Sequence, residues 1–122
     1  ELAAQYATEN SYIYDLGCST GTTMLLMDKT VKENISFVGI DDSEEMIIKC
    51  QQKLDNFNLN RKIELSVADL TENVPIKNAS VVTMVLVLQF IRPIHRKEII
   101  KKIYEGINPG GVFIIIEKIP LA

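Results

Sequence analysis

The chain runs Tyr12-Ile13-Tyr14-Asp15-Leu16-Gly17-Cys18-Ser19-Thr20-Gly21 at the point that decides its fold, where an apolar segment breaks directly into a loop of small residues. A second apolar segment, residues 35–40, ends at Asp41. A strand, a glycine loop that opens a helix, and an acid at the tip of the next strand are the parts of half a nucleoside-binding fold. The pattern predicts a strand over residues 11–16 and a ligand site where that strand ends.

The other elements follow from the spacing of apolar residues, with strands predicted over 63–67, 80–88 and 112–116 and helices over 22–31 and 43–57. The last two strands lack alternation, which is typical of strands buried on both faces of a parallel sheet. Between them Pro93 suits a first helical position, and Asn108-Pro109-Gly110-Gly111 ends that helix. The order βαβαβ and then βαβ predicts an α/β fold with a doubly wound parallel sheet.

The composition is that of a single globular domain: 122 residues, 47% hydrophobic and 24% charged. A net charge of −3 gives no general reason to expect direct nucleic-acid binding. We interpret the basic residues around Pro93 as the solvated face of a helix: Arg92, His95, Arg96, Lys97, Lys101 and Lys102. No apolar run approaches the ~20 residues of a membrane span, and two cysteines suggest no disulfide framework, so a cytoplasmic protein is expected.

The glycine loop has the spacing G-x-x-x-G, because Ser19 stands between Gly17 and Gly21 where a dinucleotide fold has its middle glycine. This spacing suits a ligand without phosphates whose charged end is an amino acid. Backbone N–H groups at the helix start can bind the carboxylate of that ligand, and Asp15 can orient the loop or attract the ammonium. The alternative is a tight turn that needs glycine for its conformation alone, and the loop by itself leaves both open.

Two acids after the next strands favour a ligand. Asp41 can accept two hydrogen bonds side by side from a ribose diol. Asp42 and Ser43 can cap the following helix, and Asp42 and Glu45 can do so as a reciprocal pair. Asp41 is therefore not needed as a cap and is available to a ligand. Asp69 can accept from an adenine amino group while the Leu70 N–H donates to a ring nitrogen. The alternative roles are a helix cap for Asp41 and a turn cap for Asp69.

No catalytic residue can be assigned. The strand over 80–88 ends without a carboxylate or histidine, and Gln89 either hydrogen-bonds a substrate or closes the loop. Cys18 is interpreted as a small packed side chain and His95 as solvent-facing, and no set of residues suits a metal.

These residues resemble the class I S-adenosylmethionine-dependent methyltransferases. Asp15 to Gly21 is similar to the first motif of that family, Asp41 to its ribose acid and Asp69 to its adenine-side acid. The resemblance implies a Rossmann-like fold and S-adenosyl-L-methionine as cofactor. The contacts expected for that cofactor are Asp15, Gly17, Cys18, Ser19, Gly21, Asp41, Asp42, Met46, Asp69, Leu70, Val85 and Gln89. Because the final strands of that fold are missing, residues 1–122 are expected to be one cofactor-binding domain of a partial chain.

Several segments also resemble the carboxy-S-adenosyl-L-methionine synthases, formerly described as tRNA (5-carboxymethoxyuridine 34) methyltransferases: Tyr14 to Ser19, Leu88-Gln89-Phe90, Lys102 to Gly111 and Glu117-Lys118. The resemblance implies a carboxylated cofactor made from S-adenosylmethionine and prephenate, which a partner enzyme uses to modify a tRNA wobble uridine. Val85 stands where that family usually carries an asparagine.

Other functions stay open. An ordinary methyltransferase acting on a small molecule would tolerate Val85 better than a carboxylating enzyme. A cofactor-binding module without catalysis fits the absence of a general base. A nicotinamide-dependent oxidoreductase is disfavoured by the Gly17-x-x-x-Gly21 spacing. The sequence does not fix the oligomeric state, and a homodimer is one alternative.

Overall fold

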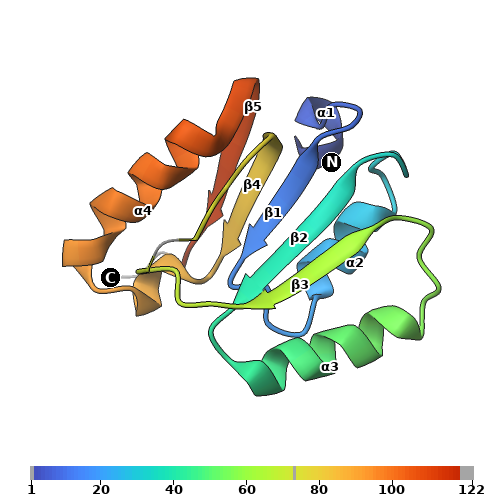
Figure 1. Ribbon diagram of the computed structural model, residues 1–122, viewed down its shortest axis with the longest axis horizontal. Coiled ribbons are helices and arrows are strands. Elements are labelled where there is room, and N and C mark those ends of the chain that lie inside the picture. Colours follow the sequence, from blue (N-terminus) through green and yellow to red (C-terminus); the bar gives the residue numbers. More distant parts are fainter. Residues whose placement is uncertain (1, 73, 119–122) are drawn as a thin grey trace.

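The computed structural model describes residues 2–72 and 74–118, which form a five-stranded sheet in the order β3-β2-β1-β4-β5 (Figure 1). All four neighbouring pairs are parallel. The strands are β1 (Tyr12–Leu16), β2 (Ser36–Asp41), β3 (Ile63–Val67), β4 (Ala79–Val85) and β5 (Ile107–Ile116). The doubly wound parallel sheet predicted from the sequence is confirmed. The chain reverses its direction of travel across the sheet between β1 and β4, which is where open α/β sheets bind ligands.

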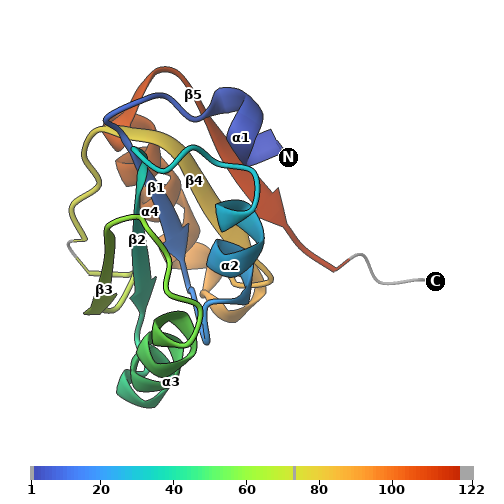
Figure 2. The ribbon, with the colours of Figure 1, turned by 90° about the vertical axis from the view of Figure 1, so that its right-hand side faces the viewer.

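Helices cover both faces of this sheet (Figure 2). They are α1 (Leu2–Tyr6), α2 (Thr22–Asp28), α3 (Glu44–Asp55) and α4 (Pro93–Gly106), with a short 3₁₀ turn, η1, over Leu88–Phe90. Apolar residues of α1, α2 and α3 pack in one core with Ile13, Phe37 and Val81 of the sheet. Apolar residues of α4 pack in a second core with the buried apolar side chains on the other face of the sheet. Because successive strand residues point to opposite faces, this two-sided burial explains the continuous apolar runs of the sequence.

Several expected boundaries were wrong, among them the end of the helix expected over 22–31, which lies at Asp28. The strand expected over 80–88 ends at Val85, because Leu86 takes a left-handed conformation (φ 56°) and the chain turns into η1. The segment Asn108-Pro109-Gly110-Gly111 does not precede β5 but lies within it. The register with β4 shifts there, because Ala79 pairs with Ile107 whereas Val81 pairs with Val112. The helix Leu2–Tyr6 has no counterpart in the predicted elements.

The start of α3 is also capped differently from the expected pair of Asp42 and Glu45. The N-cap is Ser43, whose Oγ accepts a hydrogen bond from the Met46 N–H at 3.2 Å. Ser43 has an extended backbone, as an N-cap requires, and two acids in the first turn complement the helix dipole. The cap leaves Asp42 exposed at the edge of the sheet.

A buried arginine joins the segment after α2 to the start of β3. The Arg61 side chain is 1% exposed, forms an ion pair with Asp28 and lies 4.2 Å from the centroid of the Phe37 ring. Its guanidinium donates to four backbone carbonyls, those of Val31 (2.6 Å), Ile35 (2.7 Å), Lys32 (2.9 Å) and Asp28 (3.5 Å). Arg61 therefore supplies hydrogen-bond donors to the carbonyls of Val31 and Ile35 in buried positions.

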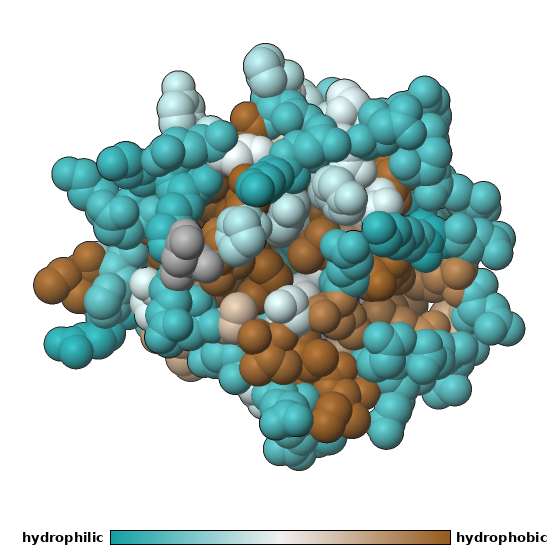
Figure 3. Space-filling model, in the orientation of Figure 1, coloured by the Kyte–Doolittle hydropathy of each residue, from teal (hydrophilic) through white to brown (hydrophobic). Residues whose placement is uncertain are grey.

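The surface seen in Figure 3 is mostly hydrophilic, with hydrophobic side chains gathered between the charged ones. Phe90 and Ile94 are among the most exposed large apolar side chains, at 81% and 76%. Within residues 2–72 and 74–118, no helix has the length and apolar character that crossing a membrane requires.

Candidate functional site

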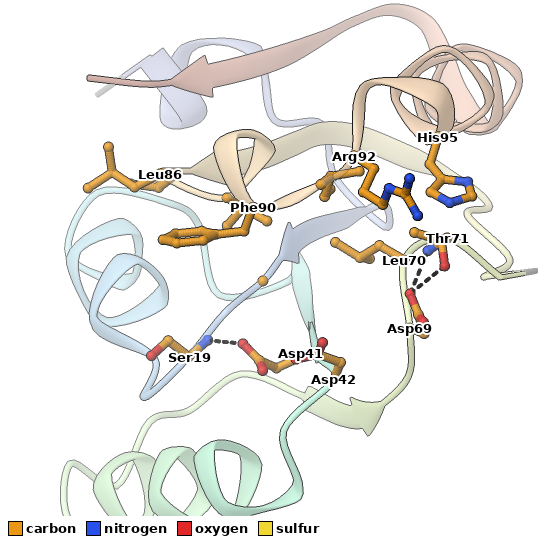
Figure 4. A pocket seen from close by; sticks show the side chains of 14 residues that line it. Ser19, Asp41, Asp42, Asp69, Leu70, Thr71, Leu86, Phe90, Arg92 and His95 are labelled. Atoms are coloured by element: carbon orange, nitrogen blue, oxygen red, sulfur yellow. Dashed lines mark hydrogen bonds between the residues drawn. The ribbon is translucent and has the colours of Figure 1, made fainter. Parts of the chain in front are cut away.

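The carboxyl ends of four strands surround a cleft of about 710 Å³ (Figure 4). Its lining residues come from the glycine loop, from the tips of β2, β3 and β4, and from the start of α4: Gly17, Ser19, Asp41, Asp42, Asp69, Leu70, Thr71, Val85, Leu86, Val87, Phe90, Ile91, Arg92 and His95. The cleft lies at the edge of the sheet that the sequence predicted for a ligand.

The structure brings most of the predicted cofactor contacts together in this cleft, namely Gly17, Ser19, Asp41, Asp42, Asp69, Leu70 and Val85. The others do not line it. Asp15 is buried behind the glycine loop, Cys18 and Gly21 are buried residues of the loop itself, and Met46 lies on α3. Gln89 is exposed on η1.

The glycine loop needs its glycines for conformation and for space. Gly17 and Gly21 both have left-handed backbones, with φ of 76° and 89°. A Cβ on Gly17 would overlap the Val87 side chain, and one on Gly21 would lie 2.7 Å from Cys50 Sγ. The Gly17 N–H donates to the Ile40 carbonyl at 2.7 Å, which fixes the loop against β2. The glycines are therefore needed for the conformation of the loop, whether or not the loop also holds a ligand.

Asp41 is not spare, contrary to the expectation that Asp42 and Ser43 would leave it free. Its Oδ2 accepts from the Ser19 N–H at 2.9 Å and its Oδ1 from the Ser43 N–H at 3.0 Å. Figure 4 shows the first of these bonds, which spans from β2 to the glycine loop. A carboxylate has about four acceptor positions, so each oxygen of Asp41 keeps one for a ligand.

Asp69 has the turn-capping role that the sequence allowed. Its Oδ1 accepts from the Thr71 N–H at 2.8 Å and from Thr71 Oγ1 at 2.7 Å. These hydrogen bonds, with a smaller contribution from the charge of His95, hold the pKa of Asp69 below its usual range. Asp69 lines the cleft as an anion, and among the described residues its Oδ2 accepts no hydrogen bond.

Asp15 lies directly behind the loop, 2% exposed. Its Oδ1 accepts from Thr83 Oγ1 at 2.8 Å across the β1–β4 pair. Burial raises the pKa of Asp15 from 3.8 to about 7, although the hydrogen bond from Thr83 opposes that change. A carboxyl in this position acts on the cleft through the loop and through its charge, because it does not reach the cleft surface.

Sequence reasoning missed the opposite wall of the cleft. Leu86, Phe90, Arg92 and His95 line it from the segment that joins β4 to α4 (Figure 4). His95, interpreted from the sequence as solvent-facing, is half-buried and lines this wall beside Thr71. Pro93 was the available signal: it marks the start of α4 after the connection that leaves the β4 tip at the ligand edge of the sheet.

The two walls differ in chemistry. Carboxylates of Asp41, Asp42 and Asp69 lie on one, and the other carries apolar side chains with Arg92 and His95 toward Asp69. Such a cleft suits a ligand with hydroxyls and a positive charge on one side and an apolar face on the other. Among the described residues, no group of three His, Cys, Asp or Glu could hold a metal ion. Cys18 is buried, in agreement with its interpretation as a packed side chain.

Comparison with known proteins agrees with the family resemblance of the sequence. A family model described as a methyltransferase domain matches residues 13–111. Carboxy-S-adenosyl-L-methionine synthases are similar over 98% of this chain, with 46% identity for the protein of Pseudoalteromonas atlantica and 38% for that of Methylococcus capsulatus. The matched parts cover 49% and 50% of those proteins, so the chain spans about half the length of these curated relatives.

Solved structures share the fold at lower identity. An S-adenosylmethionine-dependent methyltransferase from Clostridium acetobutylicum is 22% identical with a TM-score of 0.77, over 93% of this chain and 45% of the other. Coclaurine N-methyltransferase bound to N-methylheliamine and SAH is 19% identical with a TM-score of 0.77, over 93% of this chain and 32% of the other.

Proposed function

The chain belongs to the methyltransferase-domain family, and we propose that its cleft binds S-adenosyl-L-methionine as the cofactor of a group-transfer reaction. The observation that carries the proposal is the convergence of four strand tips on one cleft with a glycine loop and two acids in the required order. In this proposal residues 1–122 form the cofactor-binding domain of a cytoplasmic enzyme.

Each part of the cofactor has residues suited to it. The glycine loop, with Gly17 and Ser19 at the cleft surface, holds the amino-acid end, and buried Asp15 adds a charge behind the loop. Asp41 holds the ribose hydroxyls with its two remaining acceptor positions. Asp69 and Leu70 hold the adenine edge. Cys18 and Gly21, as buried residues of the loop, and Met46, which Ser19 Oγ contacts, maintain the shape of the loop without contact with the ligand.

The reacting sulfur would lie against the β4 tip, between Val85 and Phe90. The sulfonium is already an activated donor, so the main contribution of the protein is to align it with the second substrate, which can lower a barrier by ~7–11 kcal/mol. Among the described residues of this tip, no side chain is a general base, which fits a reaction driven by alignment.

Within the family we favour an enzyme of the carboxy-S-adenosyl-L-methionine synthase type, with prephenate as second substrate and a product used in tRNA wobble uridine modification. Support comes from the relatives of that name, which are 38–46% identical over nearly this whole chain. The second candidate is a methyltransferase acting on a small molecule. It is favoured by Val85, whose apolar side chain at the cleft offers a carboxylate no hydrogen bond.

Mass spectrometry of the ligand that co-purifies with the full-length protein separates these two reactions. A carboxylated sulfonium supports the synthase. S-adenosylmethionine or S-adenosylhomocysteine alone would support the methyltransferase, and turnover of S-adenosylmethionine would exclude a module without catalysis.

Replacement of Asp41 tests the cofactor assignment. We expect Asp41→Ala to weaken S-adenosylmethionine binding by about 10- to 100-fold, because hydrogen bonds to a charged group contribute about 1.5–3 kcal/mol. Isothermal titration calorimetry measures the affinity. Asp55→Ala is the matched control, since Asp55 is an exposed aspartate of α3 that does not line the cleft. Unchanged affinity in Asp41→Ala would remove the ribose assignment.

A further inference from the structure

The bond between Asp41 and the glycine loop has a second role beside ligand recognition. Asp41 lies at the tip of β2 and its two oxygens accept from two different segments: Ser19 in the glycine loop and Ser43 at the start of α3. One carboxylate therefore connects the loop, the strand tip and the helix that together form one wall of the cleft. A backbone N–H donated to a carboxylate is among the stronger hydrogen bonds in proteins.

Ser19 is the residue of the loop that most needs such a bond. Its φ is 50°, in the left-handed region, where an L-residue with a side chain is strained. Gly17 and Gly21 take similar conformations at no such cost, because they have no Cβ. The Ser19 side chain is exposed, and its only side-chain partner among the described residues is Met46 Sδ, at 3.8 Å. A thioether is a weak acceptor, so this contact holds Ser19 poorly.

We propose that Asp41 is a positioning residue for the glycine loop: it holds Ser19 in its left-handed conformation and thereby presents the loop to the amino-acid end of the ligand. The same carboxylate keeps two acceptor positions for hydroxyls, so recognition of the ribose and placement of the amino-acid end depend on one side chain. The ligand part of this proposal rests on the proposed function, whereas the loop part concerns the protein without ligand.

The loop part is tested by hydrogen exchange of the Ser19 amide, followed by NMR in the free protein. We expect that amide to be protected in the wild type and to lose at least about tenfold of its protection in Asp41→Ala, because alanine has no side-chain acceptor for the Ser19 N–H. Asp55→Ala makes the same chemical change at an exposed site and should leave the exchange unchanged. A wild-type Ser19 amide that exchanges as fast as that of Thr20 would overturn the proposal without any variant.

The ligand part is tested with two probes, adenosine and S-adenosyl-L-homocysteine, which differ by the amino-acid end. The dissociation constant of adenosine divided by that of S-adenosyl-L-homocysteine measures what that end contributes. If the Asp41 carboxylate only binds ribose, its removal would weaken the binding of both probes equally and leave the ratio unchanged. We expect instead that the ratio falls about fivefold or more in Asp41→Ala, since the strain of one left-handed residue corresponds to at least that factor.

Rescue separates positioning from general damage. Ser19→Gly removes the strain, so it should restore most of the lost ratio when added to Asp41→Ala and change little by itself. An unchanged ratio in Asp41→Ala, or no recovery in the double variant, would contradict the proposal. Failure of both probes to bind the wild type would instead refute the proposed function, and the Ser19 amide would still decide whether Asp41 positions the loop.

Discussion

An Arg61→Ala protein is expected to lose about 3–5 kcal/mol of its free energy of unfolding, a large part of the stability of a domain of this size. The substitution leaves Asp28 without its ion-pair partner. It also leaves the carbonyls of Val31 and Ile35 without the guanidinium that now donates to them from inside the protein. Unpaired polar groups of this kind cost more than the hydrogen bonds themselves contribute.

Urea unfolding followed by circular dichroism measures this loss. Lys62→Ala is the matched control, because Lys62 is the next residue, its side chain is 63% exposed and its partner Glu64 is on the surface. The control should stay within about 0.5 kcal/mol of the wild type. Replacing both Arg61 and Asp28 by apolar residues should not restore stability, since the carbonyls would still lack donors. Recovery in that double variant would show that the ion pair, not the carbonyls, accounts for the loss.

An Asp15→Asn protein is expected to be more stable than the wild type above pH 7 and equal to it near pH 4. The pKa of Asp15 is about 7 in the folded protein against 3.8 as its ordinary value. As the pH rises from 3.8 to about 7, the unfolded chain ionises Asp15 while the folded protein keeps it protonated. Unfolding is therefore favoured progressively over that range, by on the order of 4 kcal/mol in total. Asparagine carries no charge and still accepts from Thr83.

The test is the free energy of unfolding from urea titrations at several pH values between 4 and 8. The difference between Asp15→Asn and the wild type should grow with pH and level off above about 7. Asp55→Asn, at an exposed site, should follow the wild-type pH dependence. Parallel curves for Asp15→Asn and the wild type would show that burial does not perturb Asp15. A gain in stability accompanied by weaker S-adenosylmethionine binding would show that the buried charge is retained for function.

Much of the fold could be predicted because it depends on patterns that a parallel sheet imposes. The strand over 63–67 was predicted at its observed bounds, and Pro93 correctly marked the start of α4. Asp41 and Asp69 could be placed at one edge because the carboxyl ends of parallel strands meet there. These inferences need only hydrophobicity and order along the chain.

The remaining errors concern interactions between segments. An apolar run does not reveal that Leu86 leaves the strand with a positive φ, because its side chain is of the same kind as those before it. That Asp41 already accepts two backbone N–H groups could not be read from the sequence, since both depend on the path of the chain around it. Likewise, the sequence does not reveal that Arg92 and His95, two residues of the basic helix face, also line the cleft, because that depends on the position of α4.

The position of β4 in the sheet has a consequence for how the protein is made. β1 lies between β2 and β4, yet β4 follows β1 only after two further strands and their crossovers. A chain emerging from the ribosome can pair β1, β2 and β3 early, but one long edge of β1 has no neighbour until residues 79–85 are synthesised. Contacts this distant along the chain slow folding. The first half of the sequence supplies the glycine loop and the acids at the tip of β2, but the opposite wall of the cleft comes from β4 and the segment after it. Ligand added during synthesis should therefore capture the protein only after β4 has inserted.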